Sequence, residues 1–250
     1  MTLDAVFLAA AIPAVLIAGI SKGGFGSGAA FAATPILALV IPPGQALALM
    51  LPLLMVMDAA SLRPYWGQWD RTAARLLIVG GMPGVALGWV LLARVDADLF
   101  RLLIGAIAVG FVGWQAGRTA GLLVVRPRPV GPAAGLFWGF LAGFTSFVSH
   151  AGGPAAAVYM LARGLGKTAF QATTVIVFTV TNLLKAVAFA ALGLFTPDML
   201  GVAALLAPVA ILVTWIWVRA HRLIPERAFF ALTWALLLVT GTRLIWDGLA

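Results

Sequence analysis

Residues 21–28 read SKGGFGSG and interrupt an apolar stretch that otherwise runs over residues 5–41. A second interruption stands at residues 149–154, which read SHAGGP. The chain after each break is similar, and Gln45 of the first copy recurs as Gln171 of the second, 126 positions later. Two glycine-rich breaks at corresponding places in membrane helices indicate a ligand site between two repeats.

The composition indicates whether this chain is surrounded by water or by lipid. Its residues are 63% hydrophobic and 10% charged, and the mean hydropathy is +1.08, far outside the range of soluble proteins. We expect an integral membrane protein surrounded by a lipid bilayer, without a soluble domain in its 250 residues. The net charge of +8 comes from Lys and Arg in short loops, where they act as insertion signals and not as a nucleic-acid surface.

Cysteine is absent from the sequence, which excludes disulfides, thiolate metal sites and iron–sulfur clusters. No metal or cofactor is expected. Ser149 and His150 resemble a nucleophile and base, but adjacent residues rarely align for proton transfer and no nearby carboxylate orients the ring. The sequence therefore favours a protein that is not an enzyme.

Six apolar segments are long enough to cross a membrane, at about 20 residues per crossing. They are 45–63, 73–92, 99–116, 169–191, 198–218 and 228–246.

The segments beside the two breaks are shorter, and residues 29–41 would rise only about 20 Å as a helix. We interpret both broken segments as re-entrant hairpins. The predicted fold is all-α and integral to the membrane, with repeat 1 at residues 1–117, repeat 2 at residues 132–250, and a basic cytoplasmic linker at 118–131. Each repeat has one broken-helix hairpin and three transmembrane helices.

Three crossings per repeat would turn the second repeat upside down relative to the first. The charges agree with this inversion. When the loop with Arg63, Arg71 and Arg75 is placed inside, eleven of the sixteen Lys and Arg lie inside, three lie outside, and Lys22 and Lys185 lie in the membrane. This bias is typical of a plasma-membrane protein, and it predicts that both chain ends lie outside.

The first break is the stronger candidate for anion binding. Its freed backbone N–H groups and the following helix start carry partial positive charge, and Lys22 adds an ammonium. An ammonium in hydrocarbon needs a partner, which a mobile anion would supply. The substrate-binding residues predicted here are Ser21, Lys22, Gly23, Gly24, Phe25 and Gly26.

The second break should approach the same depth from the opposite side. Its predicted substrate-binding residues are Ser149, His150, Gly152 and Gly153. Glycine breaks also occur simply to let helices pack closely, so each break alone has two interpretations. The presence of polar side chains at both breaks favours a functional site.

Three further polar residues lie within predicted spans. Asn182 and Lys185 are three positions apart on one helix face and could complete the anion shell, although Lys185 could instead extend to the membrane surface. Asp58 is either a proton-coupling carboxylate or a partner for Arg63. His150 is a second coupling candidate, because imidazole titrates near neutral pH.

Several of these motifs resemble the TauE/SafE family of sulfite and organosulfonate exporters. They are GGFG at residues 23–26 with Pro35 downstream, PPGQA at residues 42–46, and the second copy GGP at residues 152–154. The resemblance covers essentially the whole chain. It implies a bacterial inner-membrane permease for sulfur-containing anions such as sulfite, sulfoacetate or thiosulfate.

Together, the residues and the resemblance predict a secondary transporter, an exporter, that works by alternating access at a site near the membrane midplane. A passive channel for a different small anion would use the same residues and is the alternative. The expected partners are a small anionic substrate, a coupling proton or ion, and the lipid bilayer. Glycine-rich outward faces also allow a homodimer.

Overall fold

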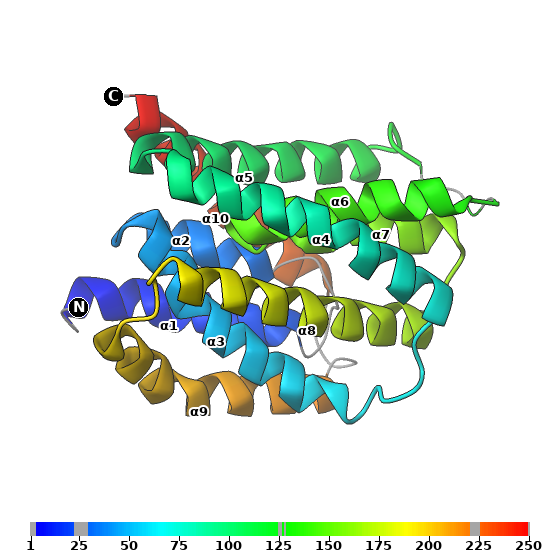
Figure 1. Cartoon of the computed structure of the whole chain (residues 1–250), viewed down its shortest axis with the longest axis horizontal. Coiled ribbons are helices and arrows are strands. Elements are labelled where there is room, and N and C mark those ends of the chain that lie inside the picture. Colours follow the sequence, from blue (N-terminus) through cyan, green and yellow to red (C-terminus); the bar gives the residue numbers. More distant parts are fainter. Residues whose placement is uncertain (1–3, 23–29, 125–126, 128, 221–225, 250) are drawn as a thin grey trace.

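The computed structural model describes residues 4–22, 30–124, 127, 129–220 and 226–249, and within them it contains helices and no strand (Figure 1). The α-helices are α1 (Ala5–Ile20), α2 (Ala33–Ala38), α3 (Pro43–Leu62), α4 (Arg71–Arg94), α5 (Ala97–Thr119), α6 (Pro132–Ser149), α7 (Gly152–Ala162), α8 (Lys167–Ala191), α9 (Pro197–Ala220) and α10 (Glu226–Leu249). A short 3₁₀ turn, η2 (Ala30–Ala32), precedes α2. The all-α expectation is confirmed for these residues.

Six of the described helices are long and apolar enough to cross a membrane: α3, α4, α5, α6, α8 and α9 up to Val218. Five of them coincide with predicted spans, and the remaining predicted span, 228–246, lies within α10. The difference is α6. We expected it to be the first arm of a hairpin, but its 18 residues meet the length and hydropathy that a crossing requires.

The helix starts are defined by local chemistry. Asp70 caps α4 by accepting a hydrogen bond from the Ala73 N–H at 2.6 Å, and Asp96 caps α5 in the same way from Leu99 at 2.8 Å. Pro132 stands in the first turn of α6, where its missing N–H costs nothing. These caps begin helices sharply in a chain whose interior is almost uniformly apolar.

Helices α4 and α6 meet backbone to backbone along a row of glycines. A Cβ added at Gly80 would lie 2.2 Å from the Leu136 carbonyl oxygen, and one added at Gly143 would lie 2.2 Å from the Gly81 carbonyl oxygen. No side chain fits at these distances, so glycine is required by packing here, as in other close membrane helix pairs. This seam joins the first half of the chain to the second.

Helices at corresponding positions of the two halves make corresponding contacts. Helix α4 packs on α6, and α9, which lies 126 positions after α4, packs on α1. Helices α3 and α8 pack on each other, and so do α5 and α10. In Figure 1, α1 begins and α2 ends near the end of the molecule where both chain termini lie. Helix α6 begins and α7 ends near the opposite end.

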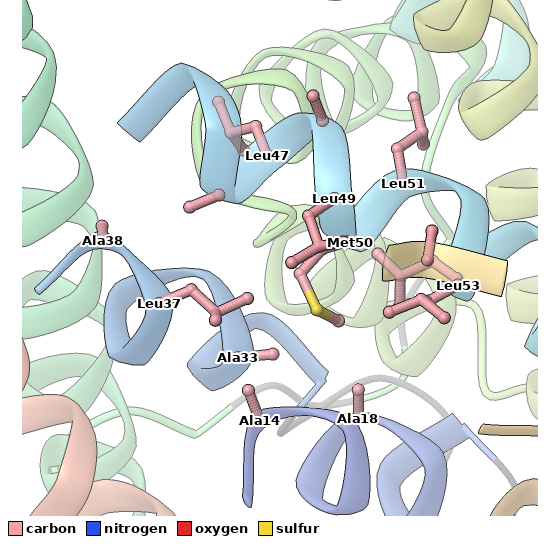
Figure 2. Close-up of a cluster of buried hydrophobic side chains, with 14 of the residues drawn as sticks. Ala14, Ala18, Ala33, Leu37, Ala38, Leu47, Leu49, Met50, Leu51 and Leu53 are labelled. Atoms are coloured by element: carbon pink, nitrogen blue, oxygen red, sulfur yellow. The ribbon is translucent and has the colours of Figure 1, made fainter. Parts of the chain in front are cut away.

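The core beside the first hairpin is built from small residues facing larger ones. Figure 2 shows Ala14 and Ala18 of α1 and Ala33 of α2 facing Met50 of α3, all of them buried. Alanine lets the three helices approach closely, and methionine fills the irregular space that remains. This packing places the end of α1 beside the middle of α3.

Candidate functional site

Asp58 lies at the centre of a buried polar cluster between α1, α3 and α8. The Lys22 ammonium, just after the end of α1, donates a hydrogen bond to its Oδ1. The Asn182 Nδ2 amide of α8 donates to its Oδ2 at 2.7 Å. The side chain of Asp58 is 1% exposed, so both carboxylate oxygens are satisfied by protein groups away from solvent.

Lys185 is the second ammonium of the cluster and is fully buried. Its Nζ donates to the Ser146 carbonyl oxygen at 2.7 Å and lies within hydrogen-bond reach of the Ser146 hydroxyl at 3.3 Å and of Asn182 Oδ1 at 3.4 Å. It also contacts His150 Nδ1. Asn182 therefore bridges the two lysines, donating to the carboxylate that Lys22 holds and accepting from Lys185.

His150 connects the cluster to α3 from the turn between α6 and α7. Its backbone is left-handed, with φ +57°, and its Nε2 lies 3.2 Å from the Leu47 carbonyl oxygen. A carbonyl oxygen only accepts, so we assign the ring proton to Nε2. In the neutral ring Nδ1 is then an acceptor, and it can receive the Lys185 ammonium.

The surroundings of Lys22 differ from those of Lys185. Its side chain is 11% exposed, and its Nζ lies 5.8 Å from the ring centre of Phe178 on α8. The Gln171 amide donates to the Lys22 carbonyl oxygen at 3.3 Å. Among the described residues, Asp58 is the one hydrogen-bond acceptor of the Lys22 ammonium, which leaves this ammonium with unused donors.

The sequence model of the family described as sulfite exporter TauE/SafE matches residues 11–244. The chain belongs to the TauE/SafE family. No curated protein and no solved structure matches it. The resemblance noted in the sequence is thereby confirmed, and a membership that covers nearly the whole chain indicates a multi-pass membrane transporter of the sulfite-exporter type.

In this TauE/SafE protein the predicted site residues fall into three groups. Lys22, His150, Asn182 and Lys185 join with Asp58 in one hydrogen-bonded cluster. Ser21, Ser149, Gly152 and Gly153 are buried at the ends of the helices that surround it. Gly23, Gly24, Phe25 and Gly26 lie outside the described residues.

Two interpretations of single residues are wrong. Lys185 does not extend to the membrane surface, because its side chain is 0% exposed and bonded to α6. Asp58 pairs with Lys22 and Asn182, and not with Arg63. In both cases a partner comes from a segment far away in the sequence, so the pairing could not be predicted from sequence spacing.

Ser149 and Gly152 serve local structure in this TauE/SafE chain. The Ser149 hydroxyl donates to the Thr145 carbonyl oxygen of its own helix at 3.3 Å. A Cβ on Gly152 would lie 2.5 Å from the Ala142 carbonyl oxygen and 2.6 Å from Phe178 Cε1. Gly152 thus lets α7 begin directly against α6 and α8, which holds His150 in the cluster.

Sequence reasoning missed three contributors: Ser146, the Leu47 carbonyl and Phe178. Ser146 stands four positions before His150, so helical spacing could have placed both on one face. The role of the Leu47 carbonyl could not be predicted from the sequence, because every residue has a backbone carbonyl. Gln171, known from the sequence only as the counterpart of Gln45, donates from its amide to the Lys22 carbonyl oxygen at 3.3 Å.

Proposed function

We propose that this TauE/SafE chain is a secondary transporter that exports small sulfur-containing anions, such as sulfite or organosulfonates, across a bacterial inner membrane. The observation that carries the proposal is the buried cluster of Lys22, Asp58, Asn182, Lys185 and His150, which joins the residue after the end of α1 to the turn between α6 and α7. The orientation derived from the arginines places both chain ends outside the cell.

The charges of the cluster favour an anionic ligand. With both lysines protonated and His150 neutral, the cluster holds two ammonium groups and one carboxylate, which leaves one positive charge without a partner. Burying such a charge in a membrane costs several kcal/mol, and pairing it with an anion offsets that cost. A sulfite or sulfonate group also offers several oxygens to hydrogen-bond donors.

Lys22 is the residue that we propose touches the anion. Its ammonium has unused donors, it is the more exposed of the two lysines, and it adjoins the break at residues 23–26. The backbone N–H groups of that break complete the proposed shell on one side. On the other side, Ser149, His150 and Gly153 line the second break.

Lys185 acts by positioning in this proposal. Its three N–H groups face Ser146, Asn182 and His150, so no donor remains for a ligand. It fixes the tautomer and direction of the His150 ring. It also adds positive potential that attracts an anion toward Lys22.

The Lys22–Asp58 pair provides a route to proton coupling. In the structure the Asp58 carboxylate pairs with the Lys22 ammonium, which is the group that we propose binds the substrate. An arriving anion would displace it, and a buried carboxylate that loses its cation takes up a proton. Anion and proton would then move together. Protonation of His150 would place an N–H against the Lys185 ammonium and break that contact, which makes His150 a second coupling candidate.

We further propose that residues 1–117 and 132–250 are inverted repeats, joined by the linker 118–131, whose hairpins move relative to each other. The support is the pairing of corresponding helices and the opposite opening of the two hairpins (Figure 1). Movement of one repeat against the other would expose the site to each side in turn.

The test is flux of labelled sulfite in proteoliposomes, with sulfoacetate, thiosulfate, sulfate and chloride as competitors. Wild-type protein should show saturable flux that responds to an imposed pH gradient. Lys22→Gln should lose this flux, whereas Lys167→Gln, at the exposed start of α8, should retain it. Flux that does not saturate and ignores the pH gradient would identify a passive channel. No sulfite-competed flux from folded protein would contradict the substrate class.

A further inference from the structure

A notch separates the first turns of α4 and α6, away from the polar cluster. Its volume is about 510 Å³, and it is lined by Arg71, Arg75, Leu76, Val79, Pro132 and Leu136, among others. Both helices begin at the same end of the molecule, opposite the two chain ends (Figure 1). The notch therefore lies where a helix bundle meets the surface of the bilayer.

The shape of the notch follows from the glycine seam beneath it. At Gly80 the two helices are in backbone contact, since a Cβ there would lie 2.2 Å from the Leu136 carbonyl oxygen. Nearer the helix starts, a Cβ added at Gly135 would still lie 2.9 Å from Leu76 Cβ, so the notch opens beside this close contact. Val79 and Leu136 are 48% and 38% exposed, so the lower part of the notch presents an apolar surface to hydrocarbon.

The upper part of the notch is basic. Arg71 and Arg75 are one helical turn apart and both exposed, and neither makes an ion pair with any residue that the structure describes. Two unpaired guanidinium groups above an apolar groove match a molecule with an anionic head and a hydrocarbon tail.

We propose that this notch is a binding site for one anionic phospholipid. The phosphate lies between Arg71 and Arg75, and an acyl chain follows Val79 and Leu136 down to the glycine seam. A choline headgroup is disfavoured because its quaternary ammonium would face the guanidinium groups. The proposal is independent of the transported substrate, because none of these residues belongs to the polar cluster.

The second half of the chain has no counterpart of this site. At the corresponding positions of α9, 126 residues later, Pro197 replaces Arg71 and Gly201 replaces Arg75. The basic notch thus exists at only one end of the molecule, the end predicted to be cytoplasmic. A lipid bound there would distinguish the two membrane faces of a protein whose halves are otherwise alike.

Native mass spectrometry of the purified chain in detergent tests the proposal, with phosphatidylglycerol and phosphatidylcholine offered at equal concentration. Wild-type protein should retain phosphatidylglycerol preferentially. The double variant Arg71→Gln/Arg75→Gln should bind it roughly tenfold more weakly. The control Arg63→Gln removes an exposed arginine at the same end but outside the notch, and it should bind as wild type does.

A second variant, Val79→Trp, fills the groove and leaves both arginines in place. It should also weaken lipid binding, and it keeps the test decisive if the double variant fails to fold, as judged by circular dichroism. Equal binding of phosphatidylglycerol by wild type and by every folded notch variant would overturn the proposal. So would displacement of the lipid by an equal concentration of glycerol phosphate, because that result identifies a site for free anions.

Discussion

The two helix breaks bring different chemistry to the same place. At the first, Lys22 extends from the end of α1 and carries its own charge into the cluster. At the second, His150 occupies a left-handed turn, and its neutral ring accepts a hydrogen bond from Lys185 of the neighbouring helix α8. The positive charge at this break therefore belongs to Lys185. The two halves share a frame of helices, but one break supplies a cation directly and the other supplies a titratable ring supported by a cation.

The same asymmetry appears in the paired helices α3 and α8. Asp58 lies in α3, and the residue 126 positions later is the apolar Leu184. Lys185 follows Leu184 in α8, and the position corresponding to Lys185 in α3 is Ala59. Nearly equivalent positions thus carry opposite charges. The comparison teaches that helices at corresponding positions can pack alike while the buried charges that they carry differ.

The strongest test of this comparison is Lys22→Gln. It should lower anion flux by about a hundredfold, because a charged contact to the bound anion is lost. It should also destabilise the fold by about 3–5 kcal/mol, since Asp58 would remain buried without its cation. Flux and thermal unfolding of the purified variant measure both effects.

The double variant Lys22→Gln/Asp58→Asn separates the two effects of that change. It removes both charges of the pair, so the stability should largely recover while transport stays absent. Recovery of transport in the double variant would show that Lys22 serves only to neutralise Asp58.

Lys185→Met should affect stability more than it affects the anion contact. It leaves His150 Nδ1 without its donor, at a cost of about 1–3 kcal/mol for a buried group that stays unpaired, whereas the Ser146 carbonyl keeps the His150 backbone N–H at 2.9 Å. Lys167→Met, at an exposed position, is the matched control and should change stability by less than about 0.5 kcal/mol. Equal unfolding temperatures for the two variants would contradict the positioning role.

Gly152→Ala tests whether the second break depends on close packing. The added Cβ would meet the Ala142 carbonyl oxygen at 2.5 Å, so α7 must shift, at a cost of about 1–3 kcal/mol. Gly113→Ala in α5 meets nothing within 4 Å and should leave stability unchanged or slightly raised. Thermal unfolding of both variants, followed by tryptophan fluorescence, gives the comparison.

His150→Asn tests the ring while keeping the turn. Asparagine adopts the left-handed backbone more readily than most residues, so the turn should persist, but the buried Lys185 ammonium loses its acceptor, at a cost of about 1–3 kcal/mol. If His150 couples protons, the pH dependence of anion flux should flatten in this variant. An unchanged profile would leave Asp58 as the coupling residue.

The smallest effect on function is expected from cysteine labels that test the inversion. The chain has no cysteine of its own, so Gln68→Cys and Ala191→Cys each create a unique label at an exposed position. Gln68 lies in the loop after α3, and Ala191 is the last residue of the corresponding helix α8. An impermeant thiol reagent applied outside should modify only Ala191→Cys. Labelling of both from one side would contradict inverted repeats.

Much of the helical frame could be predicted from the sequence. Five predicted spans coincide with helices long and apolar enough to cross a membrane, and the sixth lies within α10. Hydropathy and the positions of helix-terminating proline and glycine residues are local properties of the sequence. They therefore predict where each single helix lies, but not how the helices pack together. The role of α6 stays a prediction for the same reason, because neither the hydropathy nor the length of that segment distinguishes a hairpin arm from a crossing.

The cluster was predictable only in part. Lys22, His150, Asn182 and Lys185 were identified because polar groups in apolar segments are costly. Their partners were not. Arg63 was considered as an alternative partner for Asp58 because it is close in the sequence, whereas the structure joins Asp58 to residues 36 positions before it and 124 positions after it.

The sequence by itself determined that the chain is a helical membrane protein, where its helices lie and where they break, because these follow from composition and short-range pattern. Only the tertiary structure decided which charges meet. Lys22 pairs with Asp58, and Lys185 is enclosed by Ser146, Asn182 and His150, because α1, α3, α6 and α8 pack around one point. In a medium that solvates no charge, each buried ion depends on the partner that helix packing brings to it.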